Sequence, residues 1–382
     1  MTPATQRAIE LLKQLIATPS HTRDEGATAD LLASFLKREG VEVERIHNNV
    51  IARSEGCAAL LALMTAATDT NLIARSEGFD PARDTLLLNS HHDTVRPAAS
   101  YTRDPYAPTI DDGRLYGLGA NDAGASLVAL VELFLTLRTT PLPFNLMLLL
   151  SAEEECGGEK GIRAVMPLYG EQITMAIVGE PTSMQAAVAE RGLVVLDCVA
   201  KGISGHAARG EGVNALYIAL DDIARLRDFR FERESEVLGP IHLTTTMISA
   251  GTQHNVVPDE CRFVVDIRTT DAYTNEETVE VLRKALQSEL TPRSTRIRAS
   301  VISEEHPLVQ AALKAGAATF VSPTTSDRTL MPFPALKIGP GDSSRSHTAD
   351  EFVLLREIEQ GLQTYLTIID NLATEYGNQT LG

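Results

Sequence analysis

The chain has 382 residues, 43% of them hydrophobic and 22% charged, which is ordinary for a globular protein and long enough for two domains. Its formal net charge of −17 argues against nucleic acid or an anionic membrane as a partner. The four cysteines show no CxxC spacing and the N-terminus lacks the continuous apolar core of a signal peptide, so we expect reduced thiols and a cytoplasmic location.

The first 180 residues alternate helix-like and strand-like segments. Apolar periodicity predicts helices over about 3–16, 25–39 and 123–138, and strands over 85–90, 145–151 and 175–179. This alternation is typical of an α/β sheet with a large parallel component.

From about residue 188 the pattern changes. The segments predict the order β-α-β-β-α-β of a ferredoxin-like layer: strand 194–204, helix 213–227, strands 242–249 and 261–268, helix 274–289 and strand 295–302. A helix over 307–317, a strand over 334–340 and a long helix from about 350 then return to the α/β pattern. We therefore expect an α/β domain of residues 1–183 and 303–382, interrupted by an α+β domain of residues 184–302.

The segment IARSEG occurs twice, at 51–56 and 73–78, with an offset of 22 residues. Two copies are too few for a solenoid, so we interpret them as a local duplication near a sheet edge. Only one copy is expected to occupy the regular strand position.

Polar groups follow several predicted strands at the point where each strand ends. They are His91-His92-Asp93 after 85–90, Glu153-Glu154-Glu155 after 145–151, Glu180 after 175–179 and His347 after 334–340, with Asp122 in a glycine-rich turn between the first two. Open α/β sheets place their ligands beyond the carboxyl ends of the strands. Each group alone has an ordinary explanation, such as a helix cap or compensation of a helix dipole. Together they indicate one site.

The three consecutive glutamates indicate what that site holds. Crowded carboxylates need a counter-charge, yet the sequence has no Lys or Arg between Arg138 and Lys160, which makes a metal ion the next candidate. Histidine and carboxylate ligands without cysteine suit Zn²⁺ or Co²⁺ in a catalytic site, and five such ligands can hold two metals if one carboxylate bridges. Residues two apart on a strand face the same way, so Asp93 can orient His91 while His92 points elsewhere.

The motifs SHHDTV, GLGANDAG, AEEECGG, VGEPT and GPG…SHTADE, in this order, resemble the M20 metallopeptidase family over nearly the full chain. The resemblance implies a zinc-dependent, exopeptidase-like α/β catalytic domain with an inserted ferredoxin-like lid that forms a homodimer. It implies an amide hydrolase with two Zn²⁺ per subunit, for which Co²⁺ can substitute. Its expected substrate is a small N-acyl amino acid.

Carried onto this chain, the resemblance implies that His91 and Glu180 bind one metal, that Glu155 and His347 bind the other, and that Asp122 bridges them. Glu154 would be the general base that activates the attacking water on the metals. Glu153 would take a supporting role, and it stands where the family often has Asp.

In the lid, the resemblance implies that His206 of SGHAA reaches the partner subunit's site and stabilises the oxyanion. The alternative is that His206 only caps local structure. Asn255 and Arg268 would contact a substrate carboxylate, for which the guanidinium fork is suited. Arg268 could instead be an ordinary surface residue of a strand.

The finer resemblance favours the acetylornithine deacetylase group, so we predict release of L-ornithine from N-acetyl- or N-succinyl-L-ornithine, a step of arginine biosynthesis. The alternatives are a succinyl-diaminopimelate desuccinylase, or an aminoacylase or dipeptidase of the same family. A succinyl carboxylate would need a further cation, for which Arg191 and Arg345 are candidates. A non-catalytic binding protein is disfavoured because all six ligand and base positions are filled. GLGANDAG fits neither of the common phosphate-loop patterns, which excludes a nucleotide site.

Overall fold

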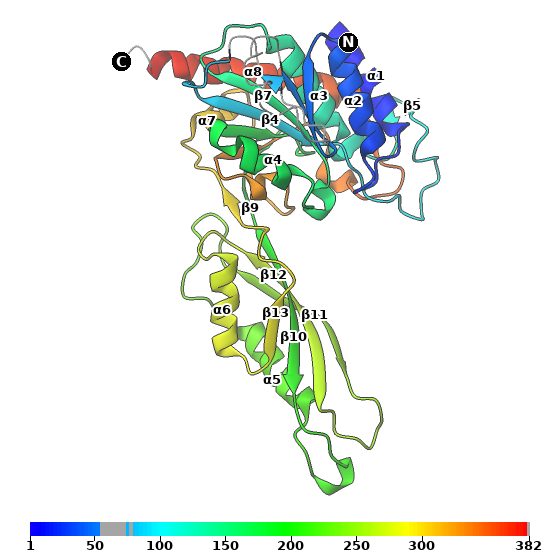
Figure 1. Cartoon of the computed structure of the whole chain (residues 1–382), viewed down its shortest axis with the longest axis vertical. Helices are drawn as coiled ribbons and strands as arrows, with labels where there is room; N and C mark the ends of the chain where they lie inside the picture. The colour runs from blue at the N-terminus through cyan, green and yellow to red at the C-terminus, as the bar shows by residue number, and fades with distance from the viewer. Residues whose placement is uncertain (54–73, 76–78, 380–382) are drawn as a thin grey trace, which may run out of the picture. The chain divides into compact units, whose positions relative to one another are not determined.

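The computed structural model describes residues 1–53, 74–75 and 79–379, and the chain divides into two compact units (Figure 1). Unit 1 comprises Met1–Val188, Ile302–Phe320 and Ser326–Gly382. Unit 2 comprises Ala189–Val301 and Val321–Thr325.

The centre of unit 1 is a sheet whose middle strands run parallel. β7 (Asn145–Ser151), β4 (Thr85–His91), β8 (Met175–Val178) and β16 (Ala335–Lys337) lie side by side in this order, and each neighbouring pair is parallel. Their carboxyl ends therefore meet at one edge of the sheet. Antiparallel strands flank them: β2 (Asn49–Arg53), β1 (Glu42–Ile46) and the short β3 (Ala74–Arg75) lie on the β7 side, and β9 (Ala186–Glu190) lies on the β16 side, where it also pairs with β15 (Thr319–Ser322).

Helices cover both faces of this sheet (Figure 1). They are α1 (Pro3–Ile16), α2 (Gly26–Arg38), α3 (Ala125–Leu137), α7 (Pro307–Lys314) and α8 (Leu355–Gln379) on one face, and α4 (Ile162–Tyr169) on the other. Alternate residues of β4 show the two faces, because Leu86 and Leu88 pack in the larger core while Leu87 packs with α4. Burial on both faces explains the continuous apolar runs in these strands.

Helix α3 lies in the middle of the larger core. Among the described residues, one stretch, Ala120–Leu137, is long and apolar enough to cross a membrane, but 78% of it is buried inside the protein. We therefore interpret α3 as a core helix. The cytoplasmic location expected from the sequence stays a prediction.

A small antiparallel sheet joins two distant parts of unit 1. β6 (Arg114–Tyr116) lies between β5 (Thr109–Asp111) and β17 (Phe352–Leu354). The long C-terminal helix, expected from about residue 350, begins only at Leu355 because residues 352–354 form β17.

Unit 2 has the order β-α-β-β-α-β. Its sheet has the order β11-β12-β10-β13, all antiparallel, formed by β10 (Gly192–Lys201), β11 (His242–Ala250), β12 (Glu260–Thr269) and β13 (Glu289–Pro292). α5 (Ala215–Asp228) and α6 (Asn275–Ala285) pack on one face with the buried residues of β10 and β12. Thr274 and Glu277 form a capping box that fixes the start of α6.

The last strand of this unit is not where the sequence predicts it. The prediction over 295–302 is wrong, because Glu289–Pro292 pairs with β10 and the buried Leu290 fills the core opposite Cys198. α6 ends at Ala285, four residues before the expected end, which leaves room for this strand. Ser300 and Val301 form β14, which instead pairs with Glu190 and Ala189 of β9.

The repeated IARSEG segment lies partly outside the described residues. In the first copy, Ile51–Arg53 belong to β2; in the second, Ala74 and Arg75 form β3. Ala52 and Ala74, which are equivalent in the two copies, both pair with Leu148 of β7. The two copies therefore share one partner on the same strand.

Candidate metal centre

The predicted ligands of unit 1 gather at the carboxyl ends of its parallel strands. His91 is the last residue of β4 and pairs in register with Ser151, the last residue of β7. Glu153 and Glu180 each follow their strand by two residues, after β7 and β8, and Glu154 and Glu155 come next to Glu153. Asp122 and His347 come from the turns after β6 and β16. Parallel register thus brings together residues that are far apart in the chain.

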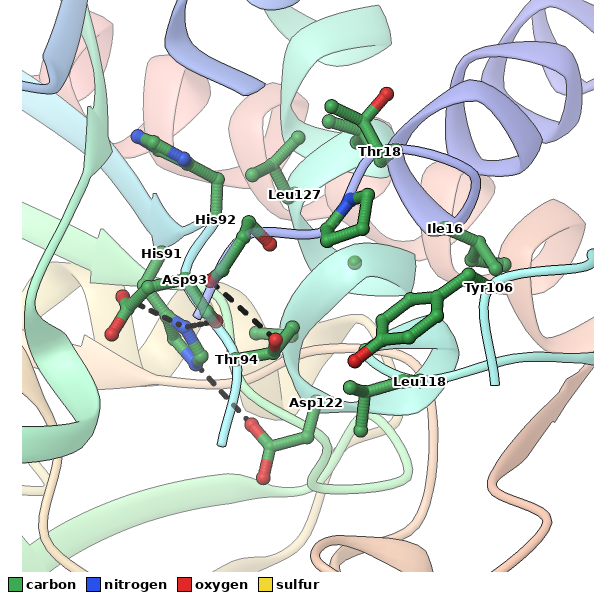
Figure 2. Close-up of a pocket in the computed structure, with 16 residues that line it drawn as sticks. Ile16, Thr18, His91, His92, Asp93, Thr94, Tyr106, Leu118, Asp122 and Leu127 are labelled. Carbon is green, nitrogen blue, oxygen red and sulfur yellow. Dashed lines mark hydrogen bonds and ion pairs between the residues drawn. The ribbon is translucent and has the colours of Figure 1, made fainter. Parts of the chain in front are cut away.

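The first group of ligands is formed by His91, Asp122 and Glu180. His91 Nε2 lies 3.2 Å from Asp122 Oδ1 and 3.7 Å from Glu180 Oε1, and the imidazole is buried. Figure 2 shows the imidazole directed at Asp122. His91 Nδ1 donates to the backbone carbonyl of Asp93 at 3.0 Å, which leaves Nε2 as the atom that faces the carboxylates.

The second group is formed by Glu155, His347 and again Asp122. His347 Nε2 lies 3.1 Å from Glu155 Oε2 and 3.7 Å from Asp122 Oδ2. Asp122 therefore turns one carboxylate oxygen toward each histidine. In each group the ligand atoms lie within 4.8 Å of one another.

Both groups fit a divalent metal ion. In the absence of a metal, the carboxylates draw protons onto the histidines: the hydrogen bond to Glu155 raises the pKa of His347 to about 9. Burial lowers the pKa of His91, but hydrogen bonds to Asp122 and Asp93 outweigh it and raise the pKa well above the ordinary value. A metal ion can replace these protons as the counter-charge. Imidazole nitrogen and carboxylate oxygen, without thiolate, are the donors of a catalytic zinc or cobalt site.

Asp93 connects the first group to the glutamates after β7. Its carboxylate is fully buried and accepts hydrogen bonds from the backbone N–H groups of Glu154 (3.1 Å) and Glu155 (3.3 Å) and from the hydroxyl of Thr22 (2.9 Å). The carboxylate lies 3.5 Å from His91 Nδ1, so the closer contact to the imidazole is the Asp93 carbonyl.

Glu154 is a carboxylate of the cluster that belongs to neither ligand group. Burial raises its pKa well above the usual range, the positive charge of His91 opposes this, and the nearby Glu180, Asp327 and Glu155 carboxylates raise it further. A carboxylate with a raised pKa can take up a proton and release it near neutral pH.

Glu153 has a different part in the same turn. Its backbone is left-handed (φ 55°), and its Oε2 accepts from the backbone N–H of Lys160 at 3.1 Å. A Cβ on Gly158 would lie 2.6 Å from the Cβ of Glu153, so the turn has no room for a side chain there. Glu153 thus closes the loop that presents Glu154 and Glu155.

His92 turns away from the cluster (Figure 2). Its Nε2 donates to the carbonyl of Asn48 at 2.8 Å and its Nδ1 contacts the Thr28 hydroxyl at 3.0 Å. Burial lowers its pKa to about 4, so it remains a neutral imidazole that holds the start of α2 near β4.

Sequence reasoning missed Glu351, although it is the last residue of the SHTADE motif. Its buried carboxylate accepts from the backbone N–H groups of Gly119, Asn121 and Asp122 at 2.8–3.1 Å. Burial, and then the Asp122 carboxylate, raise its pKa to about 7, against these three N–H groups, which favour the charged form. In the sequence, only its position four residues after His347 indicates a role in the site.

Asp327 was also missed. It is buried and accepts a 2.6 Å hydrogen bond from the Ser151 hydroxyl at the end of β7. Burial raises its pKa to about 6. The sequence gives no signal for it, because an aspartate in the polar segment TTSDRT is indistinguishable from a surface residue.

The remaining predicted residues belong to unit 2. His206 is exposed and caps a short turn, since its Nδ1 accepts from the N–H of Ala208. Asn255 lies beside it, because its carbonyl accepts from the N–H of Ala207. Arg268 lies on β12, where its guanidinium makes two hydrogen bonds to Asp266.

The two arginines considered for an acyl carboxylate already have partners. Arg345 makes a two-point ion pair with Glu357, at 2.7 and 2.9 Å. Arg191 donates to the carbonyls of Pro240 and Leu238. Both guanidinium groups are therefore already engaged in hydrogen bonds within the protein.

Comparison with known proteins shows which family has a similar sequence. A profile described as "Peptidase family M20/M25/M40" matches residues 87–371. The chain is 28% identical over 397 residues to the succinyl-diaminopimelate desuccinylase of Delftia acidovorans, covering 96% of this chain and 98% of that protein. It is 31% identical over 297 residues to the desuccinylase of Paracoccus denitrificans, covering 74% and 72%. It is 26% identical over 390 residues to the acetylornithine deacetylase of Proteus mirabilis, covering 95% and 96%.

Two solved structures share the fold. Aminopeptidase PepT from Bacillus cereus superposes with a TM-score of 0.72 at 19% identity, covering 97% of this chain and 99% of that one. The YXEP protein of Bacillus subtilis, described as a dinuclear metal-binding peptidase, superposes with a TM-score of 0.68 at 15% identity, covering 97% and 98%. Among the curated relatives, the desuccinylases match better than the acetylornithine deacetylase, so the alternative substrate considered from the sequence is favoured over N-acyl-ornithine.

Proposed function

Because the chain belongs to peptidase family M20/M25/M40 and is therefore an amide hydrolase, we propose that it removes the succinyl group from N-succinyl-diaminopimelate. The proposed hydrolysis rests on one observation: two histidine–carboxylate groups share Asp122, with Glu154 beside them. The desuccinylase relatives support the substrate.

N-acyl-L-ornithine is the second candidate. The acetylornithine deacetylase of Proteus mirabilis matches over 95% of this chain, and the motifs that resemble that group support the same substrate. The two candidates share their chemistry, because both release a diamino acid with a second, cationic amino group. A net charge of −17 is compatible with such a product.

We assign His91 and Glu180 to one divalent metal, Glu155 and His347 to a second, and Asp122 to both. Zn²⁺ is the proposed metal, with Co²⁺ able to substitute. When bound, such ions lower the pKa of water and polarise an acyl oxygen.

The protein's own residues then move the protons. Glu154 would accept the proton of the attacking water and pass it to the leaving amine, and its raised pKa makes both transfers accessible. Asp93 holds the backbone of Glu154 and Glu155 with its carboxylate and the imidazole of His91 with its backbone carbonyl, so it would act by positioning. Glu153 would fix the turn from the other side.

Residues of unit 2 would complete the site. His206 uses Nδ1 for its cap, which leaves Nε2 as the atom proposed to donate to the oxyanion. Asn255 and Arg268 are proposed to bind a substrate carboxylate. For this, Arg268 would have to exchange or share its ion pair with Asp266.

We propose a homodimer in which His206 serves the partner's site. β11 is one of the two edge strands of the unit 2 sheet, and its residues Met247 and Ile248 are 64% and 49% exposed. An exposed edge strand with apolar side chains is a surface that a second copy of this chain can pair with.

The proposal is tested by assaying purified protein for amine release from N-succinyl-diaminopimelate, N-succinyl-L-ornithine and N-acetyl-L-ornithine. Activity that a chelator abolishes and Zn²⁺ or Co²⁺ restores is expected, with the highest kcat/KM on the first. A higher kcat/KM on an ornithine derivative would move the assignment to the second candidate. No hydrolysis of any of them by metal-loaded protein would contradict both.

A further inference from the structure

Glu351 anchors the loop that carries the shared ligand. Oε1 of Glu351 accepts from the backbone N–H groups of Asn121 (2.8 Å) and Asp122 (2.9 Å), and Oε2 accepts from that of Gly119 (3.1 Å). The backbone carbonyl of Glu351 also accepts from the N–H of Gly117 at 3.0 Å. A buried carboxylate that satisfies three backbone donors fixes the path of that backbone.

Asn121 makes the complementary anchor at the other end of the His347 segment. Its Oδ1 accepts from the backbone N–H of Asp342 at 2.9 Å, and its Nδ2 donates to the carbonyl of the same residue at 3.0 Å. The segment from Asp342 to Glu351 is therefore attached at both ends to residues 117–122. His347 lies between the two attachments.

The two ligand groups differ in how their histidines are supported. His91 is the last residue of the central strand β4, and its side chain is only 1% exposed. His347 lies on an irregular segment with a left-handed backbone (φ 59°), and its side chain is 54% exposed. The sheet itself positions His91, whereas His347 depends on the anchors formed by Glu351 and Asn121.

We propose that Glu351 is a positioning residue that sets the affinity of the Asp122–Glu155–His347 group for its metal ion, with little effect on the His91–Asp122–Glu180 group. This inference rests on the proposed two-metal site. It goes beyond that site because it assigns a role in metal affinity to a residue that is not itself a metal ligand. Outer contacts of this kind change metal affinity by roughly 10–100-fold.

The test is a Zn²⁺ titration of metal-free protein, by calorimetry with a competing chelator, together with a count of bound metal. In Glu351→Gln an amide N–H₂ faces a backbone N–H donor, so one anchor contact is replaced by a clash of donors. We expect one site to stay within about threefold of its wild-type affinity and the other to lose about 10–100-fold. Glu171→Gln is the matched control, because Glu171 is an exposed glutamate of the short helix Gly170–Gln172, outside residues 117–122 and outside the segment from Asp342 to Glu351, and it should leave both affinities unchanged.

A second variant acts through the other anchor. Asn121→Ala removes both side-chain bonds to Asp342 and should weaken the same site selectively, which keeps the test valid if Glu351→Gln does not fold. Equal loss at both sites in folded variants, or no loss at either, would overturn the proposal. Wild-type protein that binds fewer than two ions would instead refute the two-metal site itself.

Discussion

The backbone N–H of Glu154 donates a 3.1 Å hydrogen bond to Asp93 Oδ1. This bond joins the end of β4 to the turn after β7, and so joins the strand that presents His91 to the turn that presents the proposed base. The position of Glu154 is thereby determined by a neighbour that is itself fully buried.

Asp93→Asn should impair catalysis without much effect on substrate binding. The amide would place an N–H₂ group against the backbone N–H of Glu154 or Glu155. The turn that carries these two residues would therefore shift, while the rest of the site would stay in place. We expect kcat to fall by about 10–100-fold with KM within about threefold. Asp112→Asn, in the exposed turn between β5 and β6, is the control. A rise in KM at constant kcat would contradict a positioning role.

The metal-free protein should lose stability as the pH rises. The folded-state pKa of His347 is about 9, above its ordinary value of 6.5, so its ion pair with Glu155 is fully present below about pH 6.5 and is lost as the pH passes through about 9. We expect the Tm of chelator-treated wild type to fall more over this range than that of His347→Gln. Parallel Tm curves for the two proteins would show that this ion pair does not contribute.

Deleting residues 51–72 should leave a folded, active protein. The deletion joins Val50 to Ile73 and restores the sequence NVIARSEG, in which Ala74 takes the partner Leu148 that Ala52 has in the full chain. Shortening a connection changes its closure entropy by only about 0.6 kcal/mol per twofold change in length. The free energy of unfolding in urea should therefore stay within about 1 kcal/mol. Loss of folding or of turnover would show that the removed residues have a role of their own.

A mixing experiment tests whether His206 acts on the partner's site. His206→Asn and Glu154→Gln should each be inactive as homodimers. In a hybrid dimer one site would regain an intact Glu154 and an intact His206 from the partner. After mixing and subunit exchange, about a quarter of wild-type activity should return. If His206 acts within its own subunit, no activity would return.

Much of the fold is predictable because its strands are buried on both faces. The apolar runs at 85–90 and 145–151 lie in β4 and β7, whose neighbours leave no polar face to obscure the pattern. Short strands such as Glu289–Pro292 were missed because pairing with β10, a distant segment, determines them. The more regular alternation of residues 295–302 therefore predicts the last strand in the wrong place.

The ligand groups could be predicted because four of their five residues end or follow parallel strands of one sheet, while the fifth, Asp122, lies in a glycine-rich turn after β6. Glu351 and Asp327 could not, since their importance depends on burial and on backbone donors supplied by distant segments. The same is true of Arg268, whose pairing with Asp266 appears only in the structure.

The proposed role of Glu154 is tested most directly by Glu154→Gln. The amide cannot carry a proton between water and amine, but it leaves both ligand groups intact. We expect two bound metal ions, as in wild type, and a kcat reduced by at least about 10²–10⁴-fold. Glu153→Gln, which keeps an acceptor for the Lys160 N–H, is the control and should retain most activity. Turnover of Glu154→Gln within a few-fold of wild type, with both metals bound, would contradict the assignment of Glu154 as the base.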